Sequence, residues 1–141
     1  MTAPADRFEV VAEPLDGLFV LARKPLTDER GVFERMFCAE AFRRWGVPAA
    51  IAQINHSLTR SRGTIRGMHF QRAPGAEVKV VSCLAGEVYD VAVDVRAGSP
   101  TFLRWHGERL SAQNRRTMVI PAGFAHGFQA LTEDCALLYL H

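Results

Sequence analysis

The chain has 141 residues, of which 48% are hydrophobic and 23% charged, and its formal net charge at pH 7 is +2. This length suits one domain with a real core, and we expect residues 1–141 to form a single domain. The small net charge and the lack of a lysine and arginine block argue against binding to nucleic acid. No apolar run is long enough to span a bilayer and residues 1–6 do not resemble a signal peptide, so we expect a cytoplasmic protein that does not enter membranes.

The cysteines give a further indication of the redox state. Cys38, Cys83 and Cys135 are odd in number and widely separated, which suits neither a disulfide framework nor a paired zinc-ligand spacing. We expect reduced thiols that fill the core.

Short apolar runs divided by turn residues predict a chain of β-strands. The first two runs, at 8–12 and 18–22, are separated by Pro14 and Gly17 and suit a hairpin. Further strands are expected at 32–37, 51–58, 77–84, 87–95, 102–110, 117–120 and 135–141. One short helix is expected at 39–45, ended by Gly46 and Pro48. About ten strands and one helix indicate an all-β, closed or sandwiched fold of jelly-roll type.

The segment 63–71, Gly-Thr-Ile-Arg-Gly-Met-His-Phe-Gln, is the first candidate for catalysis. Strand side chains alternate between faces, so Arg66 and His69 should point in opposite directions unless a bulge at Gly67 turns one of them. A histidine beside a fixed cation suits proton abstraction, because imidazole titrates near neutrality. The alternative for a lone strand histidine is a hydrogen-bonded structural residue.

Two carboxylates in the strand at 87–95 need partners if they are buried. Asp90 and Asp94 share a face with Val88 and Ala92, so an inward orientation requires a nearby cation. Lys79 is the nearest candidate in sequence, although a lysine at this position could instead protect a sheet edge.

Other polar residues are candidates for a binding site. Gln53, Asn55 and Ser57 form a polar row that either lines a wet cavity or faces solvent. The segment 121–126 predicts a compact turn that swings His126 into the mouth of a barrel. Arg30 could reach a phosphate or could be a solvated surface charge.

Taken in this order, the motifs resemble those of the dTDP-4-dehydrorhamnose 3,5-epimerases, which are jelly-roll cupins. The similarity runs from about Asp28 to the end of the chain. The segments that carry it are Asp-Glu-Arg-Gly-Val-Phe-Glu (28–34), Gln-Ile-Asn-His-Ser (53–57), Ile-Arg-Gly-Met-His-Phe-Gln (65–71), Lys79, Gly-Glu-Val-Tyr-Asp-Val-Ala-Val-Asp-Val-Arg (86–96), Ser-Pro-Thr-Phe (99–102) and Ile-Pro-Ala-Gly-Phe-Ala-His-Gly-Phe (120–128).

This resemblance implies an epimerase of a dTDP-4-keto-6-deoxy sugar that needs neither a cofactor nor a metal. His69 matches the base that removes protons beside the ketone, Tyr139 the acid that returns a proton to the opposite face, and Lys79 the cation that stabilises the enolate. The residues matched to supporting and substrate contacts are Arg30, Glu34, Gln53, Asn55, Arg66, Asp90 and His126. Arg30 and Glu34 match contacts supplied by the partner subunit, so the resemblance also implies a homodimer.

Two positions depart from the family pattern. Ile54 stands where the family usually has an acidic residue. The sequence ends at His141, so no residue matches the family's aspartate that partners the base, unless Asp90 takes that place.

Three alternatives remain at this stage. A metal-dependent cupin would use His56, His69 and His126, but three scattered histidines do not define a metal site. A nucleotide-sugar-binding protein could keep the pocket without turnover. Epimerisation at only one sugar carbon is also compatible with the sequence.

Overall fold

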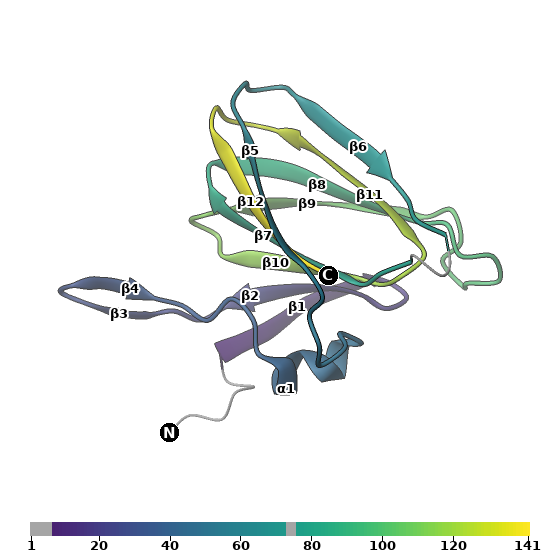
Figure 1. Cartoon of the computed structure of the whole chain (residues 1–141), viewed down its shortest axis with the longest axis horizontal. Coiled ribbons are helices and arrows are strands. Elements are labelled where there is room, and N and C mark those ends of the chain that lie inside the picture. The colour runs from purple at the N-terminus through teal and green to yellow at the C-terminus, as the bar shows by residue number, and fades with distance from the viewer. Residues whose placement is uncertain (1–6, 73–75) are drawn as a thin grey trace.

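Two antiparallel sheets face each other and a two-stranded hairpin projects from them in the computed structural model, which describes residues 7–72 and 76–141 (Figure 1). The six-stranded sheet contains, in spatial order, β1 (Phe8–Leu15), β2 (Leu18–Arg23), β10 (Arg116–Ile120), β7 (Lys79–Ala85), β12 (Cys135–Leu140) and β5 (Ile54–Thr59). The four-stranded sheet contains β6 (Ile65–His69), β11 (Phe124–Ala130), β8 (Glu87–Asp94) and β9 (Trp105–Ser111). The projecting hairpin consists of β3 (Leu26–Asp28) and β4 (Gly31–Phe33). This arrangement confirms the predicted all-β fold of jelly-roll type.

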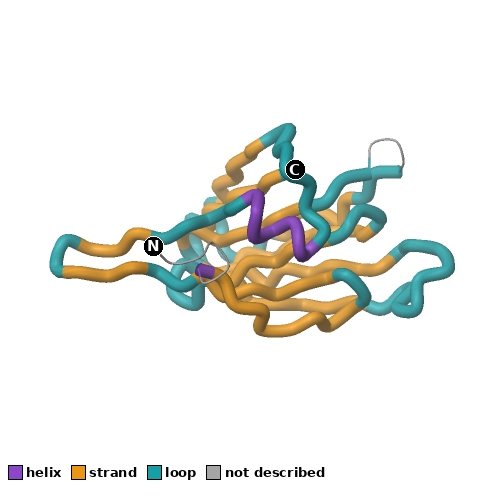
Figure 2. The backbone as a smooth tube through the Cα atoms, turned by 90° about the horizontal axis from the view of Figure 1, so that it is seen from below, coloured by secondary structure: helices purple, strands orange, loops and turns teal. Residues whose placement is uncertain are grey.

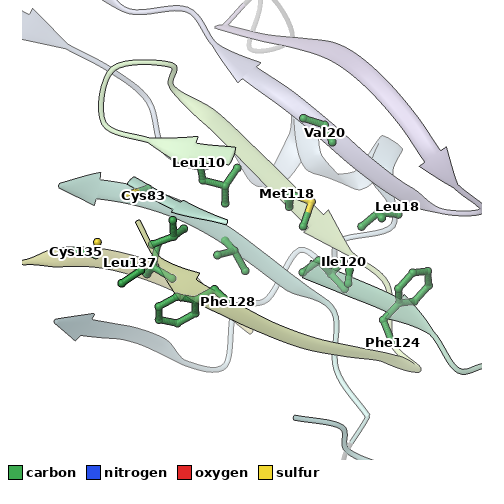
Figure 3. Close-up of a cluster of buried hydrophobic side chains, with 14 of the residues drawn as sticks. Leu18, Val20, Cys83, Leu110, Met118, Ile120, Phe124, Phe128, Cys135 and Leu137 are labelled. Carbon is green, nitrogen blue, oxygen red and sulfur yellow. The ribbon is translucent and has the colours of Figure 1, made fainter. Parts of the chain in front are cut away.

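The main hydrophobic core lies between the two sheets (Figure 3). Val81 and Met118 from the larger sheet join Leu110 and Phe128 from the smaller one in a single buried cluster. On the same two central strands, Val80 and Val119 point to the opposite face, where they belong to a second cluster. A strand that is buried on both faces has apolar residues on both, which explains why apolar and polar residues do not alternate in β7 and β10.

A short helical segment covers the outer face of the six-stranded sheet (Figure 2). Helix α1 (Ala39–Phe42) continues into a 3-10 turn (Arg43–Trp45) and ends at Gly46, whose φ of 83° is the left-handed conformation that favours glycine. The fully buried Phe42 packs edge to face on Phe8, with ring centroids 4.8 Å apart. The predicted helix at 39–45 is confirmed. In the part of the chain that the structure describes, no helix is long and apolar enough to cross a membrane.

Several predicted strand boundaries were wrong. The strand expected at 32–37 ends at Phe33, and the one expected at 102–110 begins only at Trp105. Leu103, with a φ of 65°, lies in a turn closed by a 2.7 Å hydrogen bond from its N–H to the carbonyl of Asp94. His126 lies inside strand β11 rather than in a turn, because the turn is already complete at Gly123.

The three cysteines are free thiols, as predicted. Cys83 and Cys135 are buried in the core between the sheets, and Cys38 packs against the core beneath the helix. Burial raises the pKa of the Cys83 thiol to about 11, so this thiol stays protonated and unreactive at neutral pH.

Asp94 has a charge partner other than the one predicted. Its carboxylate is fully buried and accepts two 3.0 Å hydrogen bonds from the guanidinium of Arg96, so Lys79 is not its partner. The hydroxyls of Ser99 and Thr101 donate to Oδ2 of the same carboxylate. Burial alone would raise the pKa of Asp94, but these donors outweigh it and lower the pKa well below its ordinary value.

This network predicts an acid-sensitive contribution to stability. Because the pKa of Asp94 in the folded chain lies below its ordinary value of 3.8, the contribution is fully present above about pH 4 and is lost as pH falls through the lowered value. Asp94→Asn should lower the free energy of unfolding at pH 7 by about 3 kcal/mol and flatten its fall at acidic pH. Urea titrations at several pH values test this, with Asp16→Asn as the control because Asp16 is a more exposed carboxylate, 3.6 Å from Arg96. Equal effects of the two substitutions would contradict the account.

Candidate active site

A cavity of about 380 Å³ opens between the two sheets and is lined by side chains from both. Six of the ten residues matched to the family's site lie in its wall. These are Asn55, Arg66, His69, Lys79, His126 and Tyr139. They come from strands β5, β6, β7, β11 and β12, so the fold assembles the cavity from segments that are far apart in the sequence.

A bulge in β6 turns Arg66 and His69 toward the same cavity. His69 is opposite His126 on β11 and Arg66 is opposite Phe128, so two residues of β6 face the single residue Gly127. Gly67 has a φ of 110°, and a Cβ there would lie 2.7 Å from the Cα of Gly127. The sequence allowed Arg66 and His69 to face the same side only if a bulge at Gly67 turned one of them, and this bulge is confirmed.

His126 and Asp90 form a buried pair behind the cavity. Nε2 of His126 lies 2.7 Å from Oδ1 of Asp90, and both side chains are almost completely buried. Asp90 is thus bonded to His126, and the predictions that Lys79 balances it or that it partners His69 were wrong.

The phenol of Tyr139 is a second proton-carrying group in the wall. Its hydroxyl lies 3.2 Å from Oγ of Ser57 on the neighbouring strand β5. Burial raises the pKa of Tyr139 and the charge of Asp90 adds to this effect, while Ser57 and Arg66 oppose it. The phenol therefore keeps its proton at neutral pH and can act as a donor.

Two cations line the cavity. Arg66 is held in place because its guanidinium donates 3.0 Å to Oγ1 of Thr59 and 3.3 Å to the carbonyl of Leu58. Lys79 stands at the start of β7 and also faces the cavity. Fixed positive charge, a histidine and a protonated phenol around one space can together move a proton and stabilise an oxyanion.

Three matched residues lie away from this cavity. Arg30 is at the tip of the projecting hairpin, where its guanidinium binds Asp28 at 2.6 Å. Glu34 is held by Arg23 at 3.2 Å within its own chain. Gln53 precedes β5, and its main chain pairs with that of His141.

Six further residues line the wall, of which Ser57 was expected in a polar row and His56 only as a possible metal ligand, while the other four had no predicted role. They are His56, Ser57, Gln71, Gly127, Phe128 and His141. The strand period could have identified His141, because it is two residues beyond Tyr139 and therefore shares its face. Among residues 7–72 and 76–141, no group of three or more His, Cys, Asp or Glu side chains is arranged to hold a metal ion.

Comparison with known proteins identifies the family. The model of the dTDP-4-dehydrorhamnose 3,5-epimerase family matches residues 12–141. The dTDP-4-dehydrorhamnose 3,5-epimerase of Methanothermobacter thermautotrophicus is 42% identical over 132 residues, which cover 94% of this chain and 70% of that protein.

Solved structures agree with this match. The Bacillus anthracis dTDP-4-dehydrorhamnose 3,5-epimerase, crystallised with TDP and PPi bound, superposes with a TM-score of 0.90 at 37% identity, covering 94% of this chain and 76% of that one. The Legionella pneumophila epimerase in complex with dTDP-4-keto-L-rhamnose gives a TM-score of 0.88 at 40% identity, covering 94% and 70%. The chain therefore belongs to the dTDP-4-dehydrorhamnose 3,5-epimerase family and is an isomerase of the epimerase type.

Proposed function

We propose that this chain epimerises a dTDP-4-keto-6-deoxy sugar at the carbons that flank the ketone, without a cofactor. The observation that carries this proposal is that His69, Lys79 and Tyr139 line one cavity from three different strands. The Legionella pneumophila relative was crystallised with a dTDP-4-keto sugar, which supports this class of substrate.

His69 acts as the base in the proposed reaction. Its imidazole takes the proton from a carbon beside the ketone, and the electron pair of the broken C–H bond moves into an enolate. Lys79 stabilises the negative charge that develops on the enolate oxygen. Tyr139 then donates its phenolic proton to the opposite face of the same carbon, which inverts its configuration. Solvent restores the proton of Tyr139 and removes the one from His69.

Arg66 and Asn55 position the substrate in this proposal. Arg66 is anchored by Thr59 and Leu58 at the cavity wall, and its planar fork suits a diphosphate or a sugar oxygen. Asn55 offers an amide to the sugar from β5. The buried Asp90–His126 pair supports the wall on which the sugar rests.

Turnover in heavy water tests the proposal. The protein, freed of metal by a chelator, is incubated with dTDP-4-keto-6-deoxyglucose in D₂O, and NMR follows deuterium at both flanking carbons and the inverted product. We expect deuterium at both carbons together with inversion. Deuterium at one carbon would restrict the function to a single position. Binding of the nucleotide sugar without any exchange would favour a non-catalytic binding protein, and activity only after addition of a metal would favour a metal-dependent enzyme.

We further propose a twofold homodimer in which the β3–β4 hairpin lies against the neighbouring subunit. The hairpin projects from the sheets (Figure 1) and exposes Val32 and Phe33, the latter by 65%. The edge strands beside the cavity expose Ile54 and Ile65. Reciprocal burial of these side chains would bring Arg30 toward the partner's cavity.

Disruption of the hairpin's apolar surface tests the dimer. Phe33→Asp should shift the protein from dimer to monomer in sedimentation and lower turnover by about tenfold or more, because a charge is unfavourable in an apolar interface. Leu103→Asp is the matched control, since Leu103 is 64% exposed in the turn before β9, away from the hairpin. A parent protein that is a fully active monomer at low concentration would contradict the proposal.

A further inference from the structure

His141 lies beside Tyr139 in the cavity wall, and the proposed reaction has not used it. Its N–H donates to the carbonyl of Gln53 at 2.9 Å, and its carbonyl accepts from the N–H of Ala52 at 2.8 Å. The side chain is only 11% exposed. Its backbone is thus fixed independently of its side chain, so substitutions at this position change the imidazole without releasing the strand.

Two histidine rings lie near the ring of Tyr139. The imidazole of His141 stacks on it with an interplanar angle of 8° and ring centroids 6.2 Å apart. His126, on strand β11, lies edge to face with the phenol ring, with an interplanar angle of 75° and ring centroids 6.4 Å apart. Offset stacked and edge-to-face pairs at these separations are favourable, and two of them restrict the rotation of the phenol.

Glu77 lies beside the imidazole of His141. Nδ1 of His141 lies 2.8 Å from Oε1 of Glu77. Burial lowers the pKa of His141, Lys79 and His126 lower it further, and Glu77 opposes them. His141 therefore stays neutral at neutral pH and adds no second cation beside Lys79.

We propose that His141 is a positioning residue for the proton donor Tyr139, with its flat ring holding the phenol toward the face of the sugar opposite His69. This inference rests on the proposed function and adds a residue to it.

A displaced proton donor should change the ratio of inversion to deuterium exchange rather than lower both rates equally. Once His69 has removed a proton and exchanged it for a deuteron of the heavy water, the enolate can take that deuteron back from His69, which gives deuterium exchange with retention. It can instead take one from Tyr139, which gives inversion. A displaced phenol slows only the second route, so the ratio of inversion to exchange falls while exchange continues.

The first test compares this ratio in His141→Ala, His141→Phe and His106→Ala. His106 is the matched control, because it also lies 3.2 Å from a glutamate, Glu108, but is outside the cavity wall. We expect His141→Ala to lower the ratio by about tenfold, His141→Phe to restore most of it by supplying a flat ring, and His106→Ala to leave it unchanged. An unchanged ratio in His141→Ala, no rescue by phenylalanine, or the same effect in the control would overturn the proposal.

The second test does not depend on turnover. The chain has two tyrosines, so in a Tyr89→Phe background the ultraviolet absorbance of tyrosinate reports on Tyr139 alone. His141→Ala should open the phenol to water and lower its raised pKa toward the ordinary value, whereas His141→Phe should keep it raised. If no variant or parent turns over substrate but this shift appears, the proposed function fails while the packing of His141 on Tyr139 stands. If the pKa of Tyr139 does not change, the positioning role is wrong.

Discussion

His69→Ala should reduce the rate of deuterium exchange beside the ketone by about 1000-fold, the range expected when a positioned general base is lost. His69 is exposed on the edge strand β6, whereas His126 is buried and bonded to Asp90. Because both exchange and inversion begin with removal of a proton, both should fall together. The measurement is NMR of the substrate in D₂O, at enzyme concentrations high enough to detect a residual rate.

The fold should survive this substitution. An exposed side chain on an edge strand contributes little to stability, so the free energy of unfolding should change by less than about 0.5 kcal/mol. His106→Ala serves as the control for loss of a histidine elsewhere on the same sheet. Exchange within tenfold of the parent rate in folded His69→Ala would show that another group is the base.

Gly67→Ala should be the most damaging substitution outside the reacting groups. Gly67 has a φ of 110°, and an added Cβ would lie 2.7 Å from the Cα of Gly127 and 2.8 Å from the carbonyl oxygen of His126. Both contacts are to main-chain atoms, which cannot rotate away. We expect a loss of about 2–4 kcal/mol in the free energy of unfolding, from backbone strain and overpacking together.

The same substitution should also lower turnover. Strand β6 must move away from β11 to admit the Cβ, and His69 moves with it; a displacement of about 1 Å can cost about 100-fold in rate. Gly63→Ala is the matched control, because Gly63 has a φ of 89° but no atom within 4 Å of the added Cβ. Gly63→Ala therefore introduces the backbone strain of a positive φ without a steric overlap of the added Cβ. Chemical denaturation and turnover of both variants test this, and equal losses would show that the close approach of the two strands is unimportant.

The sequence predicted the fold class and most of the cavity, and it did so through local patterns. The alternation in β8 placed Asp90 and Asp94 on one face with Val88 and Ala92, and all four residues are buried. Gly67 between Arg66 and His69 correctly suggested a bulge. The family motifs placed His69, Lys79 and Tyr139, which all line the cavity.

The partners of the buried carboxylates could not be predicted in this way. A period of two gives the face of a side chain but not its partner, so Lys79 was chosen for the buried carboxylates although Arg96 and His126 bind them. Gln53 was matched to a substrate contact by the family resemblance and placed in one polar row with Asn55, but the strand begins only at Ile54.

Tyr139→Phe tests the central claim, that His69 and Tyr139 act on opposite faces of one carbon, more directly than any other variant. The measurement is the simultaneous rate of deuterium incorporation and of inversion at each flanking carbon in D₂O. The account predicts that exchange continues at a rate near that of the parent while inversion falls by about 100-fold or more, because the base is intact and the donor is absent. Inversion that keeps pace with exchange in this variant would contradict it.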